Sequence, residues 1–134
     1  MITHSLSSQF MKARSKSNLG RNVLIIEDDA DTAEALQVTL LYEGYGVRTV
    51  KNRDEAMLAI KQNLYHFILL DYFMPGVSAQ EFISAVKVHS PMTQLVLITA
   101  AQYAQQKARE LKLKHWLGKP ILPTDLISLL QKIG

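Results

Sequence analysis

Residues 23–36 read VLIIEDDADTAEAL, and this stretch decides the fold class. Four apolar residues are followed by three acids, and the apolar residues Ala33, Leu36 and Leu40 then recur at helical spacing. A short run that is apolar on both faces is typical of a strand buried in a parallel sheet, and the spacing that follows predicts a helix over 31–43. The stretch therefore predicts a strand and a helix joined by an acidic loop.

The same alternation continues to the end of the chain. Further strands are predicted over 45–50, 67–70, 95–98 and 115–117, the last cut short by Gly118 and Pro120, and helices over 53–63, 79–88, 103–113 and 123–133. Asn52 with Glu55, and Ser78 with Glu81, have the spacing of helix-capping pairs. Five strands that alternate with helices predict a (βα)5 fold, an α/β protein whose parallel sheet is covered on both faces.

Composition narrows the classes of protein that this chain can be. Its 134 residues are enough for one domain, with 48% apolar and 20% charged residues. No apolar run approaches the roughly 20 residues that span a bilayer, so no membrane association is expected. The chain has no cysteine, which excludes disulfide scaffolds and thiol catalysis and fits a cytoplasmic location.

The basic charge belongs to the first residues of the chain. Residues 1–21 form a basic, Ser-rich tail without a secretory signal, which is either flexible or helical across Leu6–Ala13, and the domain is expected over 22–134. The net charge is +3, but residues 23–134 carry eleven Lys and Arg against twelve Asp and Glu. We therefore expect no direct nucleic-acid binding by the domain.

Polar side chains follow four of the predicted strands where each strand ends. Glu27 and Asp28 follow the first strand, Asp71 the third, Thr99 ends the fourth, and Lys119 follows the fifth. The carboxyl ends of parallel strands lie along one edge of the sheet, where such folds bind ligands. These side chains are therefore expected to converge. Asp29, also in the first loop, is expected to cap the following helix rather than to bind a ligand.

This set of groups suits one kind of chemistry. Clustered carboxylates repel one another unless a cation joins them, and Mg²⁺ prefers such hard oxygen ligands, with Mn²⁺ as a substitute. A lysine and a hydroxyl group have no part in holding a bare cation, but they would bind the oxygens of an arriving phosphoryl group. A carboxylate can itself accept that group as the nucleophile. The residues thus predict an aspartate that becomes phosphorylated.

Four segments together resemble the response-regulator receiver domain of two-component signal transduction. They are VLIIEDDADTAEAL (23–36), FILLDYFMPG (67–76), LVLITA (95–100) and HWLGKPI (115–121), which occur in the family's order across residues 22–134. The resemblance implies a flavodoxin-like, doubly wound, five-stranded parallel sheet with strand order 2-1-3-4-5.

The resemblance also assigns roles to individual residues. Asp71 becomes the phospho-acceptor, and Thr99 contacts the phosphoryl group. Lys119 pairs either with that group or with Asp71, and it precedes a cis peptide bond to Pro120. The implied ligands of Mg²⁺ are Asp71, Asp28, Glu27 through a water molecule and the backbone carbonyl of Phe73. Trp116 stands where the family usually has Tyr or Phe, and with Thr99 it is the implied switch pair.

The function implied by this resemblance is a phosphorylation-activated signalling switch. A histidine kinase or phosphotransfer protein would donate the phosphoryl group to Asp71. The face formed by helix 103–113, strand 115–117 and the last helix would then control a downstream protein effector, a missing output domain or a homodimer. No enzymatic activity is expected beyond self-phosphorylation and autodephosphorylation. The latter should be slow, because Phe73 and Ala101 stand two residues beyond the acceptor and the threonine and cannot hydrogen-bond a water molecule.

Other functions remain as alternatives. An unphosphorylated, degenerate receiver would act as a protein-interaction scaffold, although the complete set of site residues argues against it. An aspartate-based phosphatase of the haloacid-dehalogenase kind would need a second Asp where this chain has Phe73. A flavodoxin-like cofactor carrier would need a phosphate-binding loop after the first strand, but Glu27, Asp28 and Asp29 would repel phosphate.

Overall fold

The computed structural model describes residues 21–134, which form one sheet of five parallel strands in the order β2-β1-β3-β4-β5. This confirms the predicted (βα)5 fold and the strand order that the resemblance implied. The strands are β1 (Asn22–Ile26), β2 (Gly46–Val50), β3 (Phe67–Asp71), β4 (Gln94–Ala100) and β5 (His115–Lys119). The helices are α2 (Ala30–Tyr42), α3 (Arg53–Gln62), α4 (Ala79–His89), α5 (Ala101–Glu110) and α6 (Pro123–Ile133).

The prediction of a flexible or helical tail concerns residues 1–21, of which residues 1–20 lie outside the described part of the chain. Within residues 21–134, no helix combines the length and the apolar character needed to cross a membrane.

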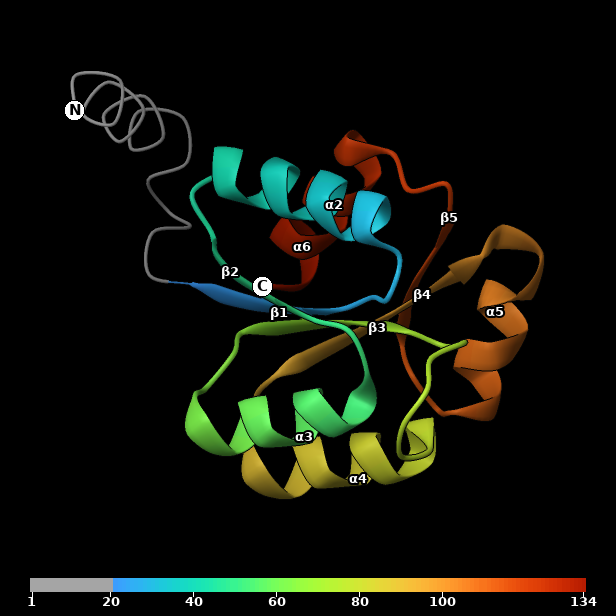
Figure 1. Ribbon diagram of the computed structural model, residues 1–134. Helices are drawn as coiled ribbons and strands as arrows, with labels where there is room; N and C mark the ends of the chain where they lie inside the picture. Colours follow the sequence, from blue (N-terminus) through green and yellow to red (C-terminus); the bar gives the residue numbers. More distant parts are fainter. Residues whose placement is uncertain (1–20) are drawn as a thin grey trace.

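Helices cover both faces of the sheet, as Figure 1 shows. On one face, Val23 and Ile25 of β1 pack with the buried residues of α2 and α6. On the other face, Leu24 and Ile26 of the same strand pack with α3, α4 and α5. Because successive side chains of a strand point to opposite faces, a strand buried on both faces has to be apolar at every position. This is the physical origin of the uninterrupted runs in β1, β3 and β4.

Three helices begin at side-chain caps that the sequence predicted. Asp29 accepts a hydrogen bond from the Thr32 amide at 2.9 Å, Asn52 from the Glu55 amide at 2.8 Å, and Ser78 from the Glu81 amide at 3.0 Å. Each cap satisfies an amide that has no partner within its own helix. All three caps lie in loops at the carboxyl edge of the sheet, and those of Asp29 and Ser78 also fix the loops that follow β1 and β3.

Two predicted elements, the last strand and the helix before it, had wrong boundaries. The strand predicted over 115–117 runs on through Gly118 to Lys119, because Gly118 pairs with Thr99 inside the sheet. A Cβ atom there would lie 2.5 Å from the Cα of Ala101, so glycine permits close approach rather than ending the strand. The helix predicted over 103–113 instead begins at Ala101 and ends at Glu110.

The register of the strands brings the polar residues together. Ile26 pairs with Leu70, so Glu27 and Asp71 are each the next residue along two neighbouring strands. Asp71 pairs with Ile98, which places Thr99 one residue further along β4. Ala100 pairs with Lys119 on the outer strand β5. One edge of the sheet thus carries the acids, the hydroxyl group and the lysine.

Candidate functional site

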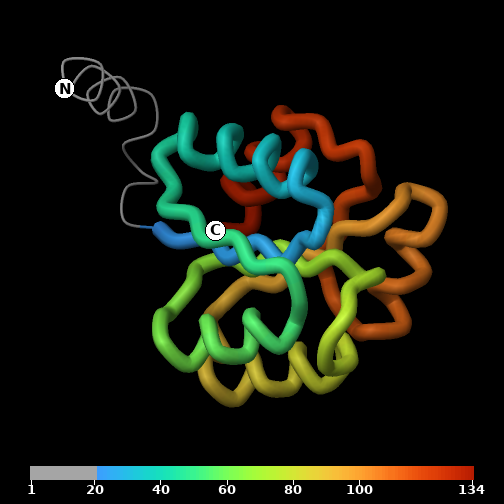
Figure 2. Tube along the Cα trace, viewed as in Figure 1, coloured from blue at the N-terminus to red at the C-terminus, as the bar shows by residue number. Residues whose placement is uncertain are grey.

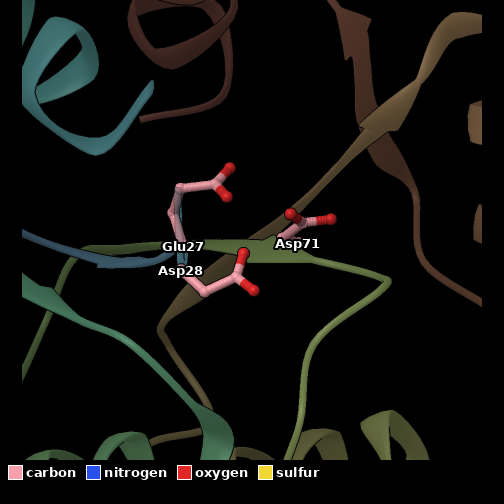
Figure 3. Close-up of side chains that lie close together, drawn as sticks. All are labelled: Glu27, Asp28 and Asp71. Atoms are coloured by element: carbon pink, nitrogen blue, oxygen red, sulfur yellow. The ribbon is translucent and has the colours of Figure 1, made fainter. Parts of the chain in front are cut away.

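Three carboxylates meet where β1 and β3 end. Glu27, Asp28 and Asp71 each offer one oxygen atom, and these atoms all lie within 4.8 Å of one another. Figure 3 shows the three side chains at the ends of their strands. Glu27 and Asp71 are only 2% and 5% exposed, whereas Asp28 is open to solvent. Two buried acids side by side require a cation, and the exposed third acid leaves an approach from solvent.

Lys119 supplies positive charge to this cluster. Its Nζ atom donates to Glu27 Oε1 at 2.5 Å and to Asp71 Oδ2 at 2.8 Å, so the side chain reaches from β5 past β4 to the ends of β1 and β3. Contact with Asp71 was one of the two arrangements that the resemblance implied, whereas contact with Glu27 was not foreseen. The only feature of the sequence that pointed to a contact between Lys119 and Glu27 was the excess of acidic residues at this edge of the sheet.

The pKa values of two groups reflect this buried arrangement. Burial raises the pKa of Glu27, and the charge of Asp71 adds to this, while hydrogen bonds from Lys119 and the Asp29 amide oppose it. Burial by itself lowers the pKa of Lys119, but its hydrogen bonds to Asp71 and Glu27 and their negative charges together raise it. Lys119 is therefore a firmly held cation between the two acids.

The donor set fits a hard divalent cation. The cluster consists of carboxylate oxygens, which Mg²⁺ prefers. Phe73, whose backbone carbonyl the resemblance implied as a further ligand, lies in the loop after β3. The Phe73 amide donates to Asp71 Oδ1 at 3.2 Å, which ties this part of the loop to the cluster. Among residues 21–134, no hydrogen-bond donor occupies the Phe73 carbonyl. The residues named by the sequence thus supply oxygen ligands that suit Mg²⁺.

The other predicted site residues lie around this edge. Thr99 is 1% exposed near the end of β4. Trp116 is 38% exposed on β5, where Leu117 packs toward α2 and α6, so Trp116 points to the opposite face. The peptide bond between Lys119 and Pro120 is cis.

Asp29 supports the site without joining the metal cluster. Its side chain caps α2, as predicted, and its backbone amide donates to Glu27 Oε2 at 3.1 Å. Glu27 is thus held by the Asp29 amide at one oxygen and by Lys119 at the other.

Aromatic side chains gather around the loop after β3. Phe73 is 58% exposed and makes edge-to-face contacts with Tyr72 and Tyr103, at centroid distances of 4.8 and 6.0 Å. Lys107 lies over the Tyr72 ring, 4.9 Å from its centroid, and pairs with Glu110 at 3.3 Å. One basic side chain of α5 thus packs against Tyr72 in the loop after β3.

Sequence reasoning missed one buried residue beside the site. Arg53, the first residue of α3, is 5% exposed and donates hydrogen bonds to backbone carbonyls of the loop after β3. An arginine at the start of a helix gives no signal of burial, because exposed arginines are the rule at such positions.

Comparison with known proteins agrees with this site. The doubly wound sheet carries acids, a hydroxyl group and a lysine at its carboxyl edge. Residues 23–131 match the model of the response regulator receiver domain, so the chain belongs to this family. The receiver domain is a signalling module of two-component systems rather than a classical enzyme.

Individual relatives show the extent of the similarity. The uncharacterized transcriptional regulatory protein YkoG of Bacillus subtilis is 30% identical over 109 residues, which are 80% of this chain and 48% of that protein. An uncharacterized 14.6 kDa protein of Leptolyngbya boryana is 30% identical over 115 residues, covering 83% of this chain and 88% of that protein. The chemotaxis response regulator CheY4 of Vibrio cholerae aligns with a TM-score of 0.75 at 25% identity, over 85% of this chain and 98% of its own. The chain thus spans about half the length of the regulatory proteins it matches.

Proposed function

We propose that this protein is a phosphorylation-activated switch in which Asp71 accepts a phosphoryl group from a histidine kinase or phosphotransfer protein. The observation that carries this proposal is the buried Asp71 carboxylate, which lies beside two further acids and 2.8 Å from Lys119. A carboxylate in this setting is both a nucleophile and a metal ligand. The absence of cysteine fits the reducing cytoplasm, where we place this switch.

The transfer would proceed by direct displacement. One oxygen of the Asp71 carboxylate attacks phosphorus, the new O–P bond forms, and the N–P bond to the donor imidazole breaks with its electron pair going to the ring nitrogen. Lys119, now shared between Glu27 and Asp71, and the Thr99 hydroxyl would bind the oxygens of the transferred group. The donor approaches from the solvent side, where Asp28 and Phe73 are exposed.

The residues that would hold Mg²⁺ are Asp28, Asp71, the Phe73 carbonyl and Glu27 through a water molecule. When bound, the cation would neutralise the negative charge of the phosphoryl oxygens. Mn²⁺ accepts the same oxygen ligands and is a reasonable substitute.

The signal would leave through the face formed by α5, β5 and α6. A phosphoryl group on Asp71 adds negative charge and an acceptor for Thr99, whose strand β4 lies directly beside β5. Several relatives are named transcriptional regulatory proteins, and this chain covers about half of their length. The receiver would therefore act on an output domain, on a separate protein effector or on a second copy of itself through this face.

The test is phosphorylation by a small acyl phosphate. Wild-type protein should become labelled only with Mg²⁺, as measured by mass spectrometry of the intact protein. Asp71→Asn should abolish labelling, while Asp125→Asn, an exposed acid on α6, should leave it unchanged. Full labelling of Asp71→Asn would refute the assignment. A folded wild-type protein that is never labelled would favour the scaffold function.

A further inference from the structure

Arg53 donates hydrogen bonds to most of the backbone carbonyls in the loop between β3 and α4. Its backbone amide donates to the Pro75 carbonyl at 3.1 Å. Its guanidinium Nη1 donates to the carbonyls of Met74 and Val77 at 3.1 and 3.0 Å, and its Nη2 donates to the Tyr72 carbonyl. Four of the six carbonyl groups of residues 72–77 therefore accept a hydrogen bond from this one residue.

The loop is seated closely on the first turn of α3. Figure 2 shows the chain after β3 folding back toward the start of α3 before it enters α4. Gly76 has a φ of 108°, and a Cβ atom there would lie 3.0 Å from the Arg53 nitrogen and 3.1 Å from the Asp54 nitrogen. Glycine is therefore required both by backbone conformation and by contact with α3.

The Phe73 carbonyl accepts no hydrogen bond within residues 21–134, whereas the carbonyls on either side of it do. Arg53 holds the carbonyls of Tyr72 and Met74, on either side of Phe73, and no donor within residues 21–134 occupies the Phe73 carbonyl itself. The planar guanidinium group presents several donors in a fixed fork, which a lysine cannot reproduce. One rigid group thus restrains both peptide units that flank the candidate metal ligand.

The positive charge of Arg53 does not favour the binding of a cation at the neighbouring acidic cluster. No ion pair joins Arg53 to an acid in the described chain, and its hydrogen bonds go to neutral carbonyls. A buried guanidinium close to the acidic cluster would repel Mg²⁺. The hydrogen-bond geometry and the charge therefore have opposite effects on metal binding, and experiment can separate them.

We propose that Arg53 is a positioning residue that restrains the loop of residues 72–77 and so presents the Phe73 carbonyl to the metal at the Asp71 site. This inference rests on the proposed function, because it assigns Arg53 to the same metal-dependent phosphorylation. Arg53 touches neither the metal nor the phosphoryl group. It acts through the backbone that carries one of the ligands, in the way that groups behind metal ligands commonly orient them.

The test compares Arg53→Met, Arg53→Lys and Asn52→Ala with the wild type. Arg53→Met removes the fork and the charge, Arg53→Lys keeps the charge, and Asn52→Ala weakens the cap of the same helix without removing any hydrogen bond to the loop. Two quantities are measured on folded protein: the Mg²⁺ dissociation constant, by calorimetry, and amide hydrogen exchange of the segment 72–78.

We expect both Arg53 variants to bind Mg²⁺ on the order of tenfold more weakly, with faster exchange in the segment 72–78, while Asn52→Ala keeps wild-type values for both. An effect of charge alone would instead tighten Mg²⁺ binding in Arg53→Met and leave Arg53→Lys unchanged, and that result would overturn the proposal. Unchanged exchange in the Arg53 variants would also overturn it.

Labelling and Mg²⁺ binding of the wild-type protein distinguish a failure of this inference from a failure of the proposed function. If wild-type protein is labelled on Asp71 and the Arg53 variants keep its Mg²⁺ affinity, only the positioning role fails. If wild-type protein binds no Mg²⁺ and is not labelled, the proposed function fails, and the role of Arg53 in presenting a metal ligand fails with it.

Discussion

At the scale of single residues, the site depends on one lysine shared by two buried acids. Glu27 is held by Lys119 on one side and by the Asp29 amide on the other, while Asp28 has no such anchor and faces solvent. Burying charges is costly unless they are paired and hydrogen-bonded, which explains why Glu27 has two partners. The exposed Asp28 is the acid that can most easily take up a direct contact with a cation.

The metal ligands should therefore differ in importance. Asp28→Ala should weaken Mg²⁺ binding more than Glu27→Ala, because Asp28 would bind directly and Glu27 through a water molecule. Lys119→Ala should keep or raise the Mg²⁺ affinity, because a competing cation is lost from the cluster. Calorimetric titration of the three variants measures the order, and weaker Mg²⁺ binding by Lys119→Ala would contradict the proposed arrangement.

A second prediction at this scale concerns the lifetime of the phosphorylated state. Phe73 and Ala101 cannot hydrogen-bond a water molecule, and the exposed Phe73 ring stands beside Tyr103 near the acceptor. Replacing them together by Phe73→Asn and Ala101→Glu should speed dephosphorylation by up to about 100-fold, because the new side chains can orient the attacking water. Decay of the label after removal of the phosphodonor measures the rate, and the idea is discarded if the double variant decays no faster than the parent.

At the scale of elements, the end of α5 shows how local conformation stops a helix. Lys112 has a φ of 59°, the Leu113 amide donates to the Ala108 carbonyl at 2.8 Å, and the Lys112 amide donates to the Arg109 carbonyl at 3.1 Å. This pair of hydrogen bonds is the Schellman arrangement, in which a residue in the left-handed conformation ends the helix. The prediction of a longer helix failed here because glycine, the usual signal, is replaced by a lysine.

The strain at this position can be relieved. Lys112→Gly should raise the free energy of unfolding by about 0.5–1 kcal/mol, since glycine adopts a positive φ without the steric cost that other residues carry. Lys112→Ala is the matched control, because alanine keeps the Cβ atom and should bring no such gain. Urea denaturation of the three proteins checks the difference, and equal stability of the Gly and Ala variants would rule out the explanation.

At the scale of the whole molecule, the question is how a change at Asp71 could reach the opposite side of β5. Thr99 pairs with Gly118, and Trp116 pairs with Leu97, so the two candidate switch residues lie on adjacent strands. Trp116 is partly exposed on the face of the sheet that α5 covers. A shift of Thr99 toward a phosphoryl group would vacate space into which an aromatic ring can turn.

The single tryptophan makes this coupling measurable. Phosphorylation should change Trp116 emission only in part, because an indole is larger than the usual Tyr or Phe and the inward position would be crowded. The smaller ring in Trp116→Tyr should make the conversion more complete, which amide exchange of α5 can follow in both proteins. Emission that stays constant on full phosphorylation would identify Trp116 as a packing residue without a switch role.

The sequence by itself determined the fold class, the strand order through the family resemblance, and the residues that meet at the edge of the sheet. It could do so because a strand buried on both faces must be apolar throughout, and because parallel strands all end at one edge. Capping side chains such as Asn52 and Ser78 accept a hydrogen bond from an amide only three residues further along the chain, so a local sequence pattern is enough to predict them.

Only the tertiary structure decided the contacts between distant residues. The pairing of Lys119 with Glu27, 92 positions apart, depends on the register of four strands and on how far one side chain reaches. Arg53 hydrogen-bonds to a loop about twenty residues away in the sequence, and the residues next to Arg53 in the sequence give no indication that it is buried. In the sequence, Gly118 indicates the end of a strand. In the structure, glycine is needed within the strand because Ala101 approaches its backbone closely. Local patterns report which face of an element is apolar, whereas these contacts arise only when separate elements pack together.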